Sequence, residues 1–195
     1  MKVLCIESTP KPLEESYGKK MMQAFVDEYK KNNPDDIVDM LDLYKEHYPP
    51  LKYEDIEGAL NEGMGRMVEE AERFKSYDKY IIGAPMWNLS VPSALKSYID
   101  HIVVSKVTFK YNRLGVPTGL LKNKSVFYIG TRGGYYPFPI SLFAHDMSYI
   151  KFIFKFMGIK KFKGFVLEGI DRKPERVARK FGRTLERIRT YAKHF

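Results

Sequence analysis

The amino-acid sequence predicts one α/β domain, in which helices cover both faces of a doubly wound parallel sheet. Short apolar runs of strand length alternate along the chain with longer segments of helical periodicity. This alternation is typical of parallel sheets, because two parallel strands can be joined only by a crossover connection. The chain of 195 residues is long enough for one well-cored domain, and a hydrophobic content of 44% is typical of a globular protein.

Five apolar runs are predicted to form the strands, at residues 2–7, 36–43, 79–85, 125–130 and 162–169. They are rich in Val, Ile, Leu and aromatic residues, as expected for strands that are covered on both faces. The single cysteine, Cys5, lies in the first run, which indicates a small core residue rather than a nucleophile.

Five helices are predicted between and after these runs: residues 16–31, 66–76, a helix that begins near Pro92, 143–157, and the terminal segment from residue 173. In the first of them Met21, Phe25 and Tyr29 recur every four residues and form one apolar face. Proline suits the first turn of a helix, which supports the start near Pro92.

The net charge of +9 indicates an anionic partner such as nucleic acid, phosphate or a nucleotide cofactor. Much of the excess lies in the terminal helix, where five basic residues lie mainly off the apolar face: Arg176, Arg179, Lys180, Arg183 and Arg187. This pattern favours a solvated helix face over a nucleic-acid-binding stripe.

Membrane spans, secretion signals and metal sites are not predicted. No stretch approaches the roughly 18 consecutive apolar residues of a spanning helix, and the N-terminus enters a strand without a signal-peptide pattern. We therefore expect a soluble, cytoplasmic protein. The four histidines, His47, His101, His145 and His194, include no pair with metal-ligand spacing.

Residues 45–65 form the one long segment without clear periodicity. A loop of this length in a compact domain is usually functional or disordered. We interpret it as a flap over a site or a dimer contact, and a tolerated surface insertion is an equal alternative.

Three loops are predicted to meet at the ligand-binding edge of the sheet, because ligands of open parallel sheets lie beyond the carboxyl ends of the strands. They are "STPKPLEESYG", "PMWNLS" and "TRGGYYP". Ser16 ends the first loop at a helix start, which suits either an anion site or a simple N-cap. The sequence has no GxGxxG or Walker A motif, which weakens Rossmann dinucleotide and P-loop interpretations.

The second and third loops have features that suit a planar ligand. Met86, Trp87 and Asn88 offer an aromatic face, a sulfur and polar groups to a heterocycle, although a buried hydrophobic turn explains them equally well. Gly133 and Gly134 allow a close approach to a ligand, or merely permit a turn.

Taken in succession, "PMWNLSVPSALKSYIDHI", "VTFKY" and "GLLKNKSVFYIGTRGG" resemble the FMN-dependent NADH-azoreductases, which are flavodoxin-like NAD(P)H:quinone oxidoreductases. The resemblance covers essentially the whole chain. It implies one flavodoxin-like FMN-binding domain over residues 1–195, with strand order 2-1-3-4-5. It also implies non-covalent FMN, NADH or NADPH as electron donor, and a homodimer.

The family's cofactor-binding positions fall on residues of the same three loops. They are Ser8, Ser16, Tyr17 and Gly18 for the phosphate, Pro85, Met86, Trp87, Asn88 and Leu89 for the ring, and Thr131, Arg132, Gly133 and Gly134. Two positions depart from the family pattern. Gly18 stands where a second phosphate serine is usual, which removes one hydroxyl, and Leu89 stands where phenylalanine is common.

The function implied by the resemblance is a ping-pong cycle. A nicotinamide passes hydride to flavin N5 and leaves, and a quinone or azo compound takes its place. Because the flavin performs the chemistry, we expect no catalytic acid–base residue. The helix within "YIKFIFKFMG" is apolar around most of its circumference and needs a further cover, which favours a dimer. Candidate substrate-pocket residues are Tyr135, Tyr136, Phe152 and Phe156, although core packing is the simpler assignment for the two phenylalanines.

Three alternative functions remain open at this point. A flavodoxin-like electron carrier would share the fold, although such carriers tend to be acidic. An NADPH-dependent FMN reductase would release its flavin as product. The hydroxyl that is missing at Gly18 favours this alternative more than a serine would. A non-enzymatic anion- or nucleic-acid-binding module would use the basic terminal helix and show a steep salt dependence.

Overall fold

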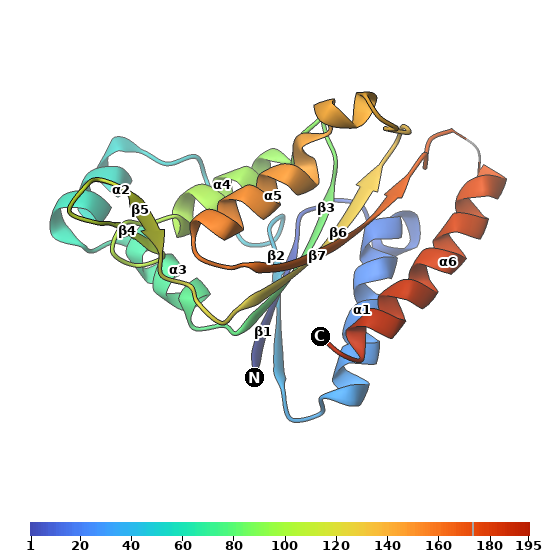
Figure 1. The fold of residues 1–195 in the computed structure, drawn as a ribbon, viewed down its shortest axis with the longest axis horizontal. Coiled ribbons are helices and arrows are strands. Elements are labelled where there is room, and N and C mark those ends of the chain that lie inside the picture. The colour runs from blue at the N-terminus through green and yellow to red at the C-terminus, as the bar shows by residue number, and fades with distance from the viewer. Residues whose placement is uncertain (173) are drawn as a thin grey trace.

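Five parallel strands form the central sheet, in the order β2-β1-β3-β6-β7 (Figure 1). The computed structural model describes residues 1–172 and 174–195. The strands are β1 (Lys2–Glu7), β2 (Ile37–Asp42), β3 (Lys79–Pro85), β6 (Ser125–Arg132) and β7 (Lys161–Glu168). All neighbouring strands pair in parallel. The five predicted strands and the strand order 2-1-3-4-5 are therefore confirmed.

Helices cover both faces of the sheet, as predicted (Figure 1). They are α1 (Tyr17–Asn32), α3 (Arg66–Lys75), α4 (Ser93–Ile102), α5 (His145–Phe156) and α6 (Pro174–Ala192). Helices α1 and α6 lie side by side on one face, and α3, α4 and α5 cover the other. Within the described residues, no helix is both long and apolar enough to cross a membrane.

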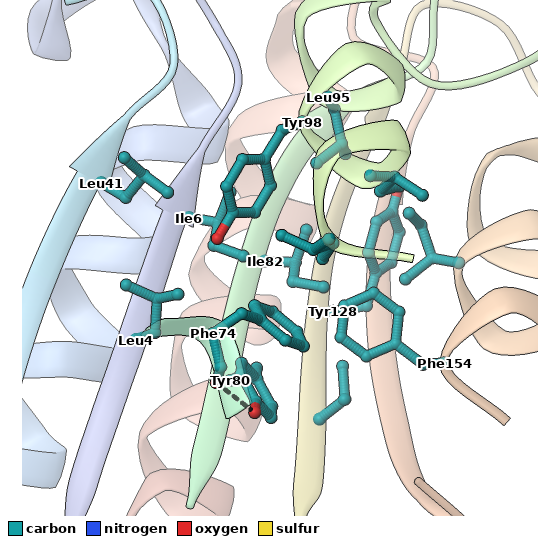
Figure 2. Close-up of a cluster of buried hydrophobic side chains, with 14 of the residues drawn as sticks. Leu4, Ile6, Leu41, Phe74, Tyr80, Ile82, Leu95, Tyr98, Tyr128 and Phe154 are labelled. Atoms are coloured by element: carbon teal, nitrogen blue, oxygen red, sulfur yellow. Dashed lines mark hydrogen bonds between the residues drawn. The ribbon is translucent and has the colours of Figure 1, made fainter. Parts of the chain in front are cut away.

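Each face of the sheet has its own hydrophobic core. Under α3, α4 and α5, Phe74 stacks on Tyr80 at 4.3 Å between ring centroids, and the Tyr80 hydroxyl donates a hydrogen bond to the Phe74 carbonyl at 2.8 Å (Figure 2). Under α1 and α6, Phe25 stacks on Phe127 at 4.4 Å. Cys5 lies fully buried in this second core, and burial raises the pKa of its thiol to about 12.

Two regions differ from the predicted elements. An antiparallel hairpin of β4 (Phe109–Tyr111) and β5 (Pro117–Gly119) was not predicted, because its strands are three residues long and the second carries a proline and a glycine. The prediction that residues 45–65 are irregular was wrong in part, because they contain α2 (Tyr53–Glu57) and a π-helical turn η2 (Gly58–Glu62). Ala59 anchors that turn by packing with Met67.

Short 3₁₀ turns precede two of the helices. They are η1 (Leu13–Glu15) before α1 and η3 (Ile140–Phe143) before α5. The predicted helix at residues 143–157 therefore begins two residues later than expected. On α5, Ile150 and Phe154 are buried against the sheet, whereas the Phe152 side chain is 68% exposed.

Candidate functional site

A cavity of about 220 Å³ lies at the carboxyl edge of the sheet. It is bounded by the loop after β1, the first turn of α1, the end of β3, the end of β6 and the loop after β7. Eight of the thirteen predicted cofactor-binding residues line it: Ser16, Tyr17, Gly18, Pro85, Met86, Trp87, Thr131 and Gly133. The three predicted loops therefore do meet at one edge of the sheet, in agreement with the rule for open parallel sheets.

The first turn of α1 gives one end of the cavity the character of an anion site. Ser16 is the N-cap, and its Oγ accepts a hydrogen bond from the Lys19 N–H at 3.1 Å. The N–H groups of Tyr17 and Gly18 have no partner within the helix, since the first turn of any helix leaves such donors free. They lie at the positive end of the helix dipole, so this end of the cavity suits a phosphate group.

Gly18 leaves space at this end of the cavity. A Cβ atom at this position would lie 3.7 Å from Ser16 Oγ and 3.7 Å from Thr131 Cγ2, which are ordinary contacts. The missing family serine is therefore a lost hydroxyl rather than a sign that the site has closed. The free N–H of Gly18 remains available to a phosphate.

The positive and negative side chains near the first turn of α1 largely balance one another in charge. Lys19 Nζ contacts Glu7 Oε1 as an ion pair without hydrogen-bond geometry, and the two side chains are 16% and 14% exposed. Lys11, Glu15 and Asp171 also border the cavity. Because acidic groups balance the lysines, backbone N–H groups rather than a positive side chain provide the main attraction for an anion.

The "PMWNLS" loop forms a tight turn that displays Trp87 at the cavity. The Met86 N–H donates to the Thr131 carbonyl at 2.8 Å, and Trp87 and Ser90 exchange backbone hydrogen bonds at 2.9 and 3.0 Å. Asn88 and Leu89 form the turn itself, in the left-handed region with φ of 47° and 67°. These two residues do not line the cavity, whereas Trp87 does and is 41% exposed.

Ser8 lies beneath the cavity and holds two strands together. Its hydroxyl donates to the Gly83 carbonyl at 2.9 Å, and its N–H donates to the same oxygen at 3.0 Å. Ser8 is fully buried, and its neighbour Thr9 borders the cavity instead. Its hydroxyl proton is therefore used within the fold.

Arg132 is part of a buried ion-pair network behind the cavity. Its Nη2 lies 2.6 Å from Asp146 Oδ1, its Nε lies 3.2 Å from Asp146 Oδ2, and its Nη1 lies 2.7 Å from Glu168 Oε1. Burial opposes the charge of the guanidinium, but the bonds to Asp146 and then Glu168 outweigh it and raise the pKa of Arg132. The side chain thus connects β6 to α5 and β7 and does not border the cavity.

The glycines after Arg132 differ in position. Gly133 borders the cavity, where a Cβ atom on it would lie 2.0 Å from Asp171 Oδ2. Gly134 lies outside the cavity, and its carbonyl accepts the Gly169 N–H at 2.9 Å. Of the two glycines, only Gly133 borders the cavity, and the Asp171 carboxylate occupies the space that a side chain at position 133 would take.

The predicted substrate-pocket residues lie outside this cavity. The Tyr135 ring lies under the Lys180 ammonium at 4.2 Å, and Tyr136 lies next to the Arg132 guanidinium at 5.6 Å. Phe156 packs against Phe109 at 4.7 Å, and Phe152 faces solvent. In this chain they have structural or surface positions, and the idea that they line a substrate pocket stays a prediction. The described residues of segment 45–65 do not border the cavity either.

Sequence reasoning missed Ile170 and Asp171, which border the cavity from the loop after β7. The signal was available, because the rule that ligands lie beyond the carboxyl ends of strands applies to the fifth strand as well. The sequence prediction covers only the loops after the first, third and fourth strands. Asp146 and Glu168, the partners of Arg132, had no sequence signal, because they are far from it in the chain.

Comparisons with known proteins agree with this architecture. The model of a family described by its flavodoxin-like fold matches residues 1–192. A protein of Clostridium beijerinckii named "FMN-dependent NADH:quinone oxidoreductase" is 40% identical over 200 residues, which cover 100% of this chain and 99% of that protein. A protein of Clostridium perfringens with the same name is 40% identical over 199 residues, with the same coverage.

Solved structures are similar over the same length. An azoreductase from Bacillus anthracis superposes with a TM-score of 0.92 at 29% identity, covering 100% of this chain and 99% of the other. A structure described as an FMN-dependent NADH-azoreductase from Bacillus anthracis in complex with FMN superposes with a TM-score of 0.88 at 26% identity. That comparison covers 99% of this chain and 98% of the other.

Proposed function

The chain belongs to the flavodoxin-like family whose model matches residues 1–192, and we propose that it is an FMN-dependent NAD(P)H oxidoreductase that reduces quinones and aromatic azo compounds. One observation carries the proposal: a single cavity joins the free N–H groups of the α1 N-terminus to the Met86–Trp87 turn and Gly133. Such a cavity suits a ligand with a phosphate at one end and a flat ring at the other. The relatives named as NADH:quinone oxidoreductases support the same activity.

The residues of the cavity fit FMN by the chemistry of their groups. Ser16 and the N–H groups of Tyr17 and Gly18 would bind the phosphate, and the "PMWNLS" loop would bind the ring beside Trp87 and Met86. Gly133 and Asp171 would border the bound ligand from the loops after β6 and β7. When bound, FMN would supply the hydride chemistry of a ping-pong cycle, in which NADH or NADPH would give hydride to flavin N5 and a quinone or azo compound would be the acceptor.

The side chains of this chain would contribute binding and orientation rather than proton transfer. Glu7 is held by Lys19, and Arg132 is held by Asp146 and Glu168. We propose no catalytic residue because the flavin would supply the chemistry, and we expect acceptor choice to follow access to the ring.

A homodimer is part of the proposal. Large apolar side chains of the segment before α5 and of α5 itself face solvent: Phe138, Leu142, Phe143 and Phe152 are 81%, 64%, 60% and 68% exposed. The His145 N–H donates to the Leu89 carbonyl at 2.7 Å, so this surface is connected to the ring loop. A second subunit here would cover apolar area and border the cavity mouth. Sedimentation of the FMN-loaded protein tests this, and a monomer at micromolar concentration would contradict it.

The activity is tested by adding FMN to the purified protein and recording the visible spectrum, followed by NADH under anaerobic conditions. We expect shifted flavin bands that bleach with NADH and return with a quinone or an azo dye. Flavin that binds but is reduced by neither NADH nor NADPH would favour the electron carrier. Flavin that is reduced and then released on gel filtration would favour the FMN reductase. Because nicotinamide donors are intracellular, the proposal also implies a cytoplasmic protein.

A further inference from the structure

A second and larger cavity, of about 570 Å³, lies at the opposite edge of the sheet. Five lysines line it: Lys122, Lys124, Lys155, Lys160 and Lys161. Among the described residues that line it, none is acidic. We call this cavity the lysine cleft. It shares no residue with the cavity at the carboxyl edge.

The lysine cleft lies at the amino ends of β6 and β7, where the loop between β5 and β6 meets the loop between α5 and β7. Ser125 and Lys161, the first residues of these strands, are register partners. The Leu121 N–H donates to the Met157 carbonyl at 2.9 Å, which ties the loop before β6 to the end of α5. Figure 1 shows both loops running into the sheet beside each other.

Two glycines allow these two loops to pass close to each other. A Cβ atom on Gly119 would lie 2.1 Å from the backbone nitrogen of Gly158, so only glycine fits. Gly158 itself has φ of 106°, in the region that favours glycine. The lysines of the cleft are therefore attached to a rigid backbone junction rather than to a loose loop.

One lysine of the cleft has a structural role. Lys124 Nζ donates to the backbone carbonyls of Lys75, at 2.9 Å, and of Tyr77. Burial lowers the pKa of this ammonium, with the charge of Asp78 opposing the shift. Lys124 thus anchors the loop, and its charge is directed into the protein.

The other four lysines have no ion-pair partner within the described parts of the chain, and all are exposed. The C-terminal end of α5 carries partial negative charge that accounts for a lysine at Lys155. It does not account for Lys122, Lys160 and Lys161, which come from other segments. Like charges gathered around one concave surface repel one another, and a bound anion of high charge would remove that repulsion.

We propose that the lysine cleft binds a compact polyphosphate, meaning a diphosphate or triphosphate group, free or as part of a nucleotide. The cleft is of ligand-pocket size. Lysine ammonium groups bind phosphate as point charges and can surround a small anion from several sides. No aromatic residue and no arginine line the cleft among the residues described, so it lacks the stacking platforms on which single-stranded nucleic acids depend.

The test is calorimetric titration of the protein with inorganic tripolyphosphate, at low and at high salt, in the presence of saturating FMN and again without FMN. With FMN filling the cavity at the carboxyl edge, we expect saturable binding at one site that weakens with salt, and this site should remain when FMN is left out. Binding that disappears when FMN is added would belong to the phosphate end of the flavin cavity and would overturn the proposal. The test can succeed or fail separately from the proposed enzymatic function, because the charge-matched variants below locate the tripolyphosphate site whether or not FMN binds.

Two double variants with equal charge loss locate the site. Lys122→Gln with Lys160→Gln should weaken tripolyphosphate binding by about five- to tenfold, since each exposed contact contributes modestly. Arg176→Gln with Arg183→Gln, on the exposed face of α6, should leave the affinity within about twofold. Equal losses in both variants would mean that only net charge matters and would contradict a site in the cleft.

Further ligands separate the sources of the phosphate. ATP that binds as tightly as tripolyphosphate means that the cleft recognises the phosphates alone, and tighter binding of ATP means that a nucleotide is the preferred form; both support the proposal. A single-stranded DNA oligonucleotide that binds with affinity rising with its length, while tripolyphosphate does not saturate, would overturn it in favour of an extended nucleic-acid surface.

Discussion

The two edges of the sheet carry their charges in opposite ways. At the carboxyl edge, Arg132 is paired with Asp146 and Glu168, and Lys19 is paired with Glu7. At the amino edge, four exposed lysines surround a cavity that no described carboxylate lines. The paired side chains at the carboxyl edge hold one another in place and neutralise their charges. This edge is therefore suited to binding a ligand through backbone donors and shape. Unpaired charges create a potential, so the amino edge is suited to attracting an anion.

The largest expected effect comes from breaking the ion pair behind the carboxyl edge. Asp146→Asn leaves the Arg132 charge buried with a weaker partner, which should lower the free energy of unfolding by about 3–5 kcal/mol. Urea denaturation measures this loss. Glu168→Gln is the matched control, because Glu168 is 26% exposed, and should cost only about 1 kcal/mol. A loss for Asp146→Asn no greater than for the control would contradict the idea that this edge is fixed by a buried pair.

At the amino edge, the corresponding rigid element is the close backbone contact between Gly119 and Gly158 rather than an ion pair. Gly119→Ala would drive a methyl group into the backbone of Gly158, which cannot move aside as a flexible side chain can. We expect a loss of about 2–3 kcal/mol in the free energy of unfolding. The control is Gly182→Ala on α6, where nothing lies within 4 Å, and alanine should stabilise the helix by up to about 1 kcal/mol. If the two variants were equally stable, the backbone contact between Gly119 and Gly158 would not be rigid.

A gain of binding is expected from restoring a hydroxyl at the carboxyl edge. Gly18→Ser fits the space beside Ser16 and Thr131, and a hydrogen bond to a charged phosphate contributes about 1.5–3 kcal/mol, so FMN should bind at least about tenfold more tightly. Flavin fluorescence titration measures the change in Kd. Gly18→Ala fits the same space without a hydroxyl and should not reproduce the gain. Equal affinities of the serine and alanine variants would place the phosphate elsewhere.

Much of this architecture was predictable, because the relevant signals are local. Apolar runs gave all five strands of the sheet, and the "PMWNLS" and "TRGG" stretches led to residues that do border the cavity. The roles of Ser8 and Arg132 were not predictable from motifs. Ser8 uses its hydroxyl on the carbonyl of Gly83, and Arg132 turns toward Asp146, fourteen positions further along the chain.

The lysine cleft was beyond sequence reasoning for a related reason. Its residues are spread from 118 to 161 over β5, α5, β7 and the two loops that lead into β6 and β7, and they meet because β6 and β7 are neighbours. Sequence alone directed attention to the terminal helix, where basic residues are contiguous. Those residues are exposed along one face of α6, and some are engaged with aromatic rings, as Lys180 is with Tyr135. The number of basic residues in one stretch of sequence therefore did not indicate where basic residues gather around a cavity in the folded protein.

The smallest expected effect tests the contrast between paired and unpaired charges directly. Lys160→Gln removes an unpaired cation from the lysine cleft, so the protein should become slightly more stable at low salt. Salt screens such repulsion, so the gain should vanish at high salt. Lys19→Gln removes the partner of Glu7, a carboxylate that is only 14% exposed, and should cost about 1–3 kcal/mol at either salt concentration. Thermal unfolding at two salt concentrations compares the variants. If both lose stability by similar amounts, the cleft lysines are paired in solution and the contrast between the two edges does not hold.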